Sequence, residues 1–124
     1  MMSIKKHEIL IAIYKYLELQ YDLDKNKTNE YIDYCSNINP FRWNDKYTAD
    51  PAYYDDFTII FSKYFKMDEC SVKEAYDFAK KYLNEYNQIE KEQFGSNIDE
   101  VVNVFSKCSF EDWEDIIDNV QSVE

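Results

Sequence analysis

The sequence predicts an all-α fold, a single compact domain of five or six helices that spans residues 1–124. The chain has one glycine and two prolines, where average composition would give about nine and six, so it has few residues for tight hairpin turns. Apolar residues recur three and four positions apart, and no useful stretch alternates apolar and polar residues. Hydrophobic residues make up 45% of the chain, enough for one core that buries roughly two-thirds of the unfolded surface.

A long first helix is expected over residues 3–23. It is almost wholly apolar except for a row of polar residues at helical spacing: Lys5, Glu8, Lys15, Glu18 and Asp22. A helix with so narrow a polar stripe is largely buried. A short second helix is expected over residues 28–35, capped by Thr28 and with Tyr31, Ile32 and Cys35 facing the core.

Residues 37–50 read as irregular chain, because Pro40 and several short polar residues interrupt any helical period. Asp50 and Pro51 then predict the start of a third helix, since Asp is favoured at the N-cap and Pro at the first helical position. This helix is expected to end near Lys66. Its inward face consists of Tyr54, Phe57, Ile60, Phe61, Tyr64 and Phe65.

Ser71 and Glu74 form a capping box ahead of a strong amphipathic pattern, which predicts a fourth helix. The pattern leaves open whether this helix breaks near Asn87 or continues to Phe94, with Gly95 as its terminator.

Serines are expected to cap the last two helices, Ser96 the fifth and Ser109 the sixth. The apolar residues that follow each serine recur at helical spacing. They are Ile98, Val101, Val102 and Phe105 in the fifth helix, and Phe110, Trp113, Ile116, Ile117 and Val120 in the sixth.

The charge of the chain is uneven. Residues 1–48 carry seven acidic and seven basic residues, whereas residues 49–124 carry eighteen acidic residues against seven lysines, which accounts for the whole net charge of −11. A negatively charged surface attracts cationic partners and repels nucleic acids and anionic membranes. The expected partner is therefore a basic protein, with no direct nucleic acid and no membrane, and the oligomeric state is left open.

The cysteines Cys35, Cys70 and Cys108 lie more than thirty residues apart, and His7 is the sole histidine. This spacing predicts neither a disulfide framework nor a structural zinc site, and no cofactor is expected. No export signal is recognised, and the apolar run near the N-terminus is shorter than the roughly eighteen residues of a membrane span. A cytoplasmic location is expected. Thirteen lysines against one arginine indicate an AT-rich genome, as in a low-GC bacterium or its phage.

Acidic residues crowd the expected outer face of the last helix, and no basic residue follows Ser109. Uncompensated like charges three and four positions apart cost stability, so a helix that needs only solubility would include lysines. Two interpretations stay open, a plain solvated face and a surface for a cationic partner. The acidic residues are Glu111, Asp112, Glu114, Asp115 and Asp118, of which Glu111, Asp112, Asp115 and Asp118 are the first partner-binding candidates.

Twelve tyrosines are more than a core of this size can bury without partners for their hydroxyls, so some are expected at the surface. Tyr53, Tyr54, Asp55 and Asp56 form one cluster. Of these, Tyr53, Tyr54 and Asp56 are the second partner-binding candidate, because tyrosine beside carboxylate is typical of interface hot spots. The alternative is that these tyrosines line the edge of the core.

Two further segments have competing interpretations. Phe41, Arg42 and Trp43 could form a recognition loop or a hydrophobic lid. Residues 22–33 place oxygen-bearing side chains at the ligand positions of an EF-hand loop, but Lys27 stands where that loop needs glycine and Asp33 where it needs glutamate. The segment is therefore read as a polar turn, and no metal site is expected.

No catalytic residue is identified, and the protein is not expected to be an enzyme. His7 has no serine or cysteine nucleophile motif beside it. Phosphate-binding loops need glycines that this chain lacks. The sequence places no two carboxylates in a pocket, as general acid and base catalysis would require.

In size, charge and composition, the whole chain resembles the small acidic immunity proteins that bacteria make against their own toxins, such as those of colicin and contact-dependent inhibition systems. The resemblance rests on no motif and carries over no functional residue. It implies an inhibitor that binds and neutralises a basic cognate toxin domain, often a nuclease, through an acidic and aromatic surface. The alternative is a phage-type acidic nucleic-acid mimic that inhibits a DNA-binding enzyme, for which an extended ribbon of carboxylates is expected.

Overall fold

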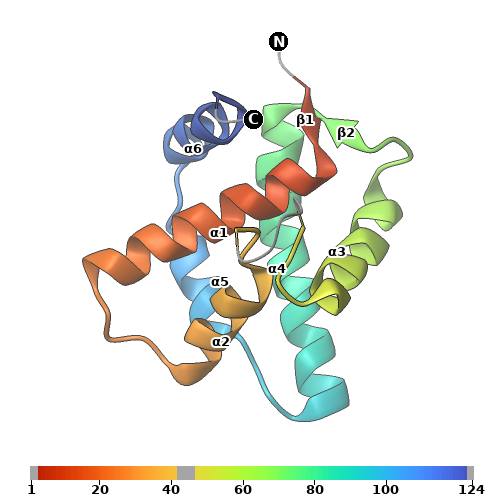
Figure 1. Ribbon diagram of the computed structural model, residues 1–124. Helices are drawn as coiled ribbons and strands as arrows, with labels where there is room; N and C mark the ends of the chain where they lie inside the picture. The colour runs from red at the N-terminus through yellow and green to blue at the C-terminus, as the bar shows by residue number, and fades with distance from the viewer. Residues whose placement is uncertain (1–2, 42–46, 123–124) are drawn as a thin grey trace.

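The structure is a computed structural model that describes residues 3–41 and 47–122. Within these residues six helices form an all-α fold, as predicted, together with one pair of two-residue strands (Figure 1). The helices are α1 (Lys6–Leu23), α2 (Asn29–Ile38), α3 (Pro51–Tyr64), α4 (Val72–Phe94), α5 (Asp99–Phe105) and α6 (Phe110–Ser122). Arg42 and Trp43, and with them the question of the recognition loop, lie outside the described residues.

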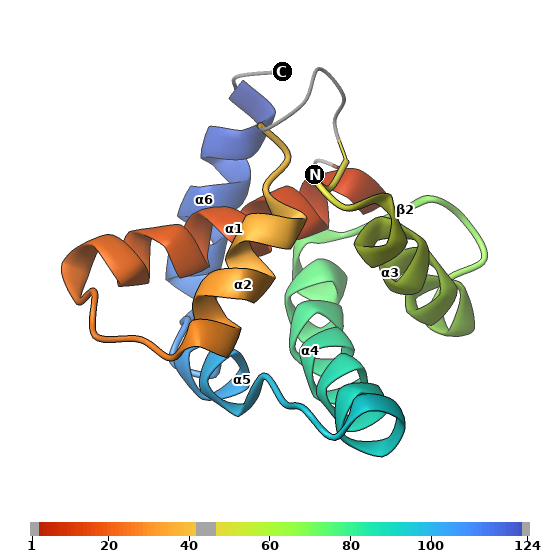
Figure 2. The same ribbon diagram turned by 60° about the horizontal axis from the view of Figure 1, so that its bottom comes forward.

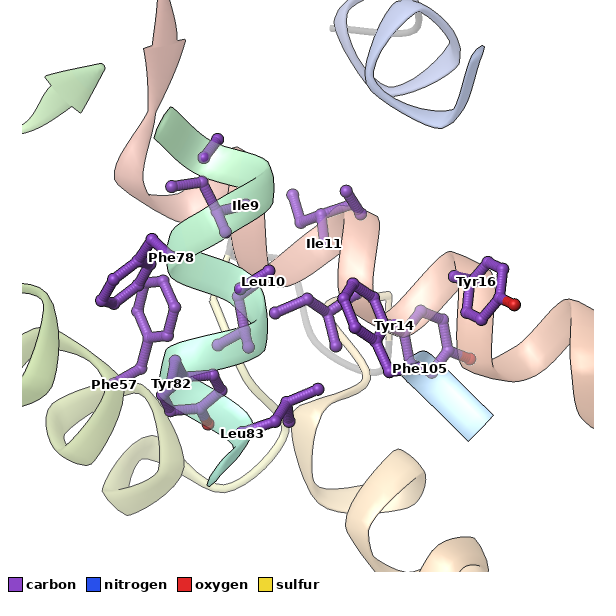
Figure 3. Packing of buried hydrophobic residues seen from close by; sticks show 14 of the residues in the cluster. Ile9, Leu10, Ile11, Tyr14, Tyr16, Phe57, Phe78, Tyr82, Leu83 and Phe105 are labelled. Carbon is purple, nitrogen blue, oxygen red and sulfur yellow. The ribbon is translucent and has the colours of Figure 1, made fainter. Parts of the chain in front are cut away.

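Helix α1 lies at the centre of the fold and contacts α2, α4, α5 and α6, while α3 packs on α4 and α2. Its apolar residues cover nearly its whole circumference, and Ile9, Ile13 and Leu17 are fully buried. Figure 3 shows α1 between the aromatic residues of α3 and α4 on one side and Phe105 of α5 on the other. The ring of Phe57 on α3 lies 4.8 Å from that of Tyr82 on α4.

The prediction that the first helix starts at residue 3 is wrong. Strand β1 (Ile4–Lys5) pairs antiparallel with β2 (Glu69–Cys70), and the amide of Lys6 donates to the carbonyl of Asp68 at 2.9 Å. The helix begins only after this pair, where the Lys5 amide donates to Glu8 Oε1 at 2.7 Å. Glu8, which was expected on the polar stripe, is therefore buried. Strands of two residues are too short to show an alternating pattern.

Two inward faces also differ from the prediction. Helix α2 continues to Ile38 and buries Tyr31 and Tyr34, whereas Ile32, expected inward, is 37% exposed. Helix α3 starts at Pro51 as predicted but ends at Tyr64. The Tyr64 side chain, also expected inward, is 44% exposed, and its hydroxyl donates to Glu85 at 3.0 Å.

Helix α4 runs without a break to Phe94, which resolves the question that the sequence left open. It starts at the predicted capping box, where Ser71 Oγ accepts from the Glu74 amide at 3.1 Å and Glu74 Oε1 accepts from the Ser71 amide at 2.9 Å. Gly95 ends it in the left-handed conformation, with φ of 69°.

Replacing Gly95 by alanine is expected to lower the free energy of unfolding by about 1 kcal/mol, because an L-residue is strained at this φ. No atom lies within 4 Å of a Cβ placed there, so the cost is one of backbone conformation alone. Urea denaturation measures it. Gly95→Asn should lose less, because asparagine tolerates this region better, and equal losses in both variants would contradict the explanation.

The predicted cap of α5 is wrong, and that of α6 is confirmed. The N-cap of α5 is Ile98. The Ile98 amide donates to Asn87 Oδ1 at 2.7 Å, and the Asp99 amide donates to Asn97 Oδ1 at 3.0 Å. The Ser96 hydroxyl instead donates to Glu90. At α6, Ser109 Oγ accepts from the Asp112 amide at 3.1 Å.

Residues 24–28 form a polar turn between α1 and α2. Asp24 Oδ1 accepts from the Asn26 amide at 3.0 Å, and Thr28 Oγ1 caps α2 by accepting from the Tyr31 amide at 3.2 Å. Two of the potential EF-hand ligands are thus engaged in holding the turn.

Candidate functional site

Helix α6 presents an acidic stripe to solvent, formed by Glu111, Asp112, Glu114, Asp115 and Asp118. The opposite face of the helix carries Trp113, Ile117 and Val120, which are at most 1% exposed. All five acidic side chains are exposed. The sequence therefore predicted the position of this stripe correctly, because the apolar period of the helix decides which side faces water.

No carboxylate of the α6 stripe forms an ion pair with any residue that the structure describes. The stripe contains five like-charge pairs at spacings of three or four residues, each of which costs about 0.2–0.5 kcal/mol in a helix. The helix N-terminus offsets part of this cost at Glu111 and Asp112 only. The stripe is thus a local concentration of negative charge that the fold does not neutralise.

The charge of Asp112 influences the pKa of two buried groups, Cys108 and Tyr16. Burial, with the Asp112 charge as the next contribution, raises the pKa of the Cys108 thiol to about 12. Burial also raises the pKa of Tyr16 to about 12, with smaller contributions from Cys108 and Asp112. Both groups are therefore neutral near pH 7, and neither balances or adds to the charge of the stripe.

The second predicted patch is divided by the fold, because Tyr53 and Tyr54 point to different neighbours. The ring of Tyr53 lies 5.9 Å from Tyr34 on α2 and 5.8 Å from Tyr86 on α4. The ring of Tyr54 lies 6.1 Å from Phe57 and carries the Lys6 ammonium 5.6 Å from its centre. Both tyrosines are half-buried, which places them at the edge of the core, whereas Asp55 and Asp56 are exposed.

Tyr53, of the second predicted patch, lies far from the α6 stripe. The indole of Trp113 on α6 donates to the carbonyl of Val72, the first residue of α4, at 3.2 Å. Tyr53 instead packs on Tyr86, near the other end of α4. At 1.5 Å per residue, these two points on α4 are about 21 Å apart, and Figure 1 shows α6 and α3, the helix that carries Tyr53, on opposite sides of the molecule. The patches are two separate surfaces.

A pocket of about 170 Å³ lies where α2, α3 and α4 meet, beside Tyr53. We call it the acidic pocket. Its lining combines three tyrosines, three carboxylates and the loop before α5: Tyr34, Tyr53, Tyr86, Glu30, Asp33, Glu90, Ser96, Asn97 and Ile98.

The tyrosines of the acidic pocket are held in place by packing and hydrogen bonds. The rings of Tyr34 and Tyr86 lie 5.6 Å apart, and both are nearly fully buried. The Tyr34 hydroxyl shares a hydrogen bond of 2.7 Å with that of Tyr82, and the Tyr53 hydroxyl accepts from Asn37 at 3.2 Å. Packing and hydrogen bonds thus restrict the positions of the Tyr34 and Tyr53 rings.

The rim of the acidic pocket is negatively charged. Glu30 and Asp33 come from α2 and Glu90 from α4, and none of the three forms an ion pair with a described residue. Desolvation, followed by the charges of Asp55, Glu90 and Asp50, raises the pKa of the nearby Asp56 above its ordinary value. These carboxylates repel one another, and a bound cation would relieve that repulsion.

Only one side of this pocket was predicted from the sequence. Tyr53 was predicted as a partner-binding residue, but Asp33, Tyr86 and Glu90 were not. A partial signal was present, since Glu30 and Asp33 on α2, and Tyr86 and Glu90 on α4, stand three or four residues apart and so share a helix face. That these faces meet depends on how the helices pack.

Other chemistry has little support among the residues that the structure describes. No three His, Cys, Asp or Glu side chains in residues 3–41 and 47–122 are grouped to hold a metal ion. Burial is the main cause that raises the pKa of all three thiols to about 12, which makes them poor nucleophiles. No helix in the described part of the chain has the length and apolar character to cross a membrane.

Comparison of the chain with protein-family models, with curated proteins and with solved structures found no match.

Proposed function

We propose that this chain is an immunity protein, an inhibitor that binds and neutralises a basic cognate toxin domain, such as a nuclease, in the cytoplasm of a bacterium. The observation that carries the proposal is that the carboxylates of the α6 stripe and the acidic pocket have no ion pair with a described residue. Lysines elsewhere do pair, as Lys63 does with Glu85 and Lys91 with Asp99. The unpaired charge is available to a cationic partner.

The two surfaces suit successive stages of binding. Exposed like charges steer an oppositely charged partner and raise the association rate. The α6 stripe, whose five acidic side chains are exposed to solvent, fits this first stage. Contacts with rigid, buried aromatic groups slow dissociation, and differences in affinity arise mainly from that step. The acidic pocket, with its tyrosine floor, fits the second stage.

The arrangement supports an immunity protein over a nucleic-acid mimic. A mimic needs an extended track of carboxylates that follows the phosphates of duplex DNA. Helix α6 has 13 residues and is about 20 Å long, and its stripe is about 21 Å from the acidic pocket along α4. Lys73, Lys80 and Lys81 stand on α4 between Val72, which contacts α6, and Tyr86, which lines the acidic pocket.

Affinity capture from the native lysate tests the proposal. The tagged protein is expected to retain one stoichiometric partner that contains a basic, toxin-like domain, identified by mass spectrometry, and to retain less of it at moderate salt than at low salt. Retention of a DNA-processing enzyme would support the mimic instead. If no basic partner is retained at either salt concentration, the proposed function is wrong.

Reversing two charges of the α6 stripe, with Asp115→Lys and Asp118→Lys, is expected to lower the association rate of the captured partner about tenfold at low salt and to flatten its salt dependence. The dissociation rate should change little. Stopped-flow or biosensor kinetics at several salt concentrations measure both rates.

A matched control separates local from overall charge. Reversing the exposed Glu69 and Glu92, which belong to neither surface, changes the net charge equally, from −11 to −7. If this control slows association as much as the α6 variant does, the effect comes from net charge and the stripe has no special part in it.

A further inference from the structure

A second hollow lies on the side of α2 opposite the acidic pocket. Two adjoining cavities, of about 280 and 410 Å³, share Tyr14, Glu18, Asp22 and Asn39 as lining residues. We call them together the α1–α2 groove. It runs between the second half of α1 and α2 and is continued by Leu19 and Phe41.

The α1–α2 groove is apolar on its floor and surrounded by exposed apolar side chains. Tyr14 and Tyr31 are buried, and the half-buried Cys35, whose thiol has its pKa raised by burial, also lines the groove. Leu19 is 51% exposed and Ile32 is 37% exposed. Several exposed apolar side chains beside a concave surface are typical of a contact with another protein.

One wall of the groove carries negative charge. Glu18 and Asp22 stand one helical turn apart on α1, and both are exposed. The ion pair between Asp22 and Lys25 is long, at 3.9 Å, and both side chains are more than 60% exposed, so it is weak. A cation from a partner can take its place. The groove therefore complements an apolar side chain that has a lysine or arginine near it.

Helix α2 is a ridge between the two hollows. Glu30 and Asp33 line the acidic pocket on one side, while Ile32 and Ser36 line the α1–α2 groove on the other. Figure 2 shows α2 at the front of the molecule, with α1 on one side and α4 on the other. A helix is about 10–12 Å wide, whereas a standard interface covers about 800 Å² on each partner. One interface can thus cover both hollows.

We infer that the basic partner straddles α2, with a lysine or arginine in the acidic pocket and an apolar side chain in the α1–α2 groove. This inference rests on the proposed function, because it takes a basic protein as the partner. It specifies further that α2, and not α6, lies at the centre of the contact. It also specifies that the partner carries a cationic and an apolar side chain about one helix width apart.

Titration of the isotope-labelled protein with short amphipathic peptides, followed by amide chemical shifts, tests the inference. The probe is a synthetic peptide with lysine and leucine on one face, compared with one in which glutamate replaces lysine and one in which serine replaces leucine. The lysine and leucine peptide is expected to shift the amides of α2 and of residues 18–22, and the other two to bind at least about tenfold more weakly. Shifts confined to α6, or no binding, would overturn the inference.

Two neighbouring substitutions separate the hollows. Asp33→Lys changes the acidic pocket and Ile32→Ser the α1–α2 groove, and each is expected to weaken the peptide about tenfold. The matched controls are Glu69→Lys on β2, which belongs to neither surface, and Ile59→Ser on α3, where Ile59 is 62% exposed, and these should stay within about twofold. Amide spectra without peptide verify that each variant is folded.

The two proposals fail in different ways. If the peptide binds α6 in place of α2, the straddled contact is wrong while a basic partner remains the proposal. If affinity capture retains no basic partner, the proposed function is wrong whatever the peptide does.

Discussion

Raising the pH above about 10 is expected to unfold the protein cooperatively, within about one to two pH units. Six buried tyrosines have a pKa above the ordinary value, chiefly because burial disfavours the phenolate: Tyr14, Tyr16, Tyr31, Tyr34, Tyr82 and Tyr86. In the unfolded chain the same groups titrate near pH 10. Above that pH the unfolded state binds fewer protons than the folded state, so the stability falls as pH rises.

The size of this effect follows from the number of protons. Each raised tyrosine removes up to about 1.4 kcal/mol of stability per pH unit above pH 10, until its folded-state pKa is reached. Six together remove up to about 8 kcal/mol per unit, against a total stability of about 5–15 kcal/mol for a domain. Their contribution is fully present below pH 10. Cys70 and Cys108, with pKa values raised to about 12, add to the loss.

Far-ultraviolet circular dichroism and tyrosinate absorbance measure unfolding and ionisation in the same titration. The absorbance of the six buried tyrosines is expected to appear together with the loss of helix. A double variant, Tyr34→Phe with Tyr82→Phe, removes two of the titrating groups and also both partners of one hydrogen bond, so its loss of stability with pH should be less steep. Ionisation near pH 10 of more than the six tyrosines outside this group, without loss of helix, would contradict the burial of these rings.

The helices could be predicted from the sequence because each has a local signal. Asp50 with Pro51, the Ser71 and Glu74 capping box, and Ser109 all start helices where predicted. The errors occur where a residue far away in the sequence determines the local structure. Ile4 forms a strand because Cys70 pairs with it, and the amide of Ile98 is satisfied by Asn87, eleven residues away.

The candidate site could be predicted only in part, for the same reason. The α6 stripe belongs to one helix, so its apolar period was sufficient to place it. The acidic pocket combines Asp33, Tyr53 and Glu90 from three helices, and no local pattern relates them. The sequence left open whether Tyr53 is an exposed contact or lines the edge of the core, and the packing of Tyr34 and Tyr86 against its ring makes it a wall of the pocket.

Replacing Trp113 by alanine is expected to lower the free energy of unfolding by about 3–5 kcal/mol, the range for a large aromatic residue removed from a core. Trp113 is 0% exposed, and its ring lies 5.9 Å from that of Phe105 on α5 and 6.2 Å from that of Tyr76 on α4. Its indole also donates to the Val72 carbonyl at 3.2 Å. The substitution therefore leaves a cavity at the junction of three helices and removes the hydrogen bond that ties α6 to the Val72 carbonyl.

Two variants separate these contributions in urea denaturation. Trp113→Phe keeps an aromatic ring but loses the hydrogen bond, so we expect a loss of about 2 kcal/mol. Glu114→Ala, at the next and exposed position, should change the stability by less than about 0.5 kcal/mol, with a small gain because it removes like-charge pairs. The same side chain that anchors α6 also sets the direction of the acidic stripe. If Trp113→Ala cost no more than Glu114→Ala, α6 would not be docked through this residue, and the stripe could not be assigned to one fixed face of the protein.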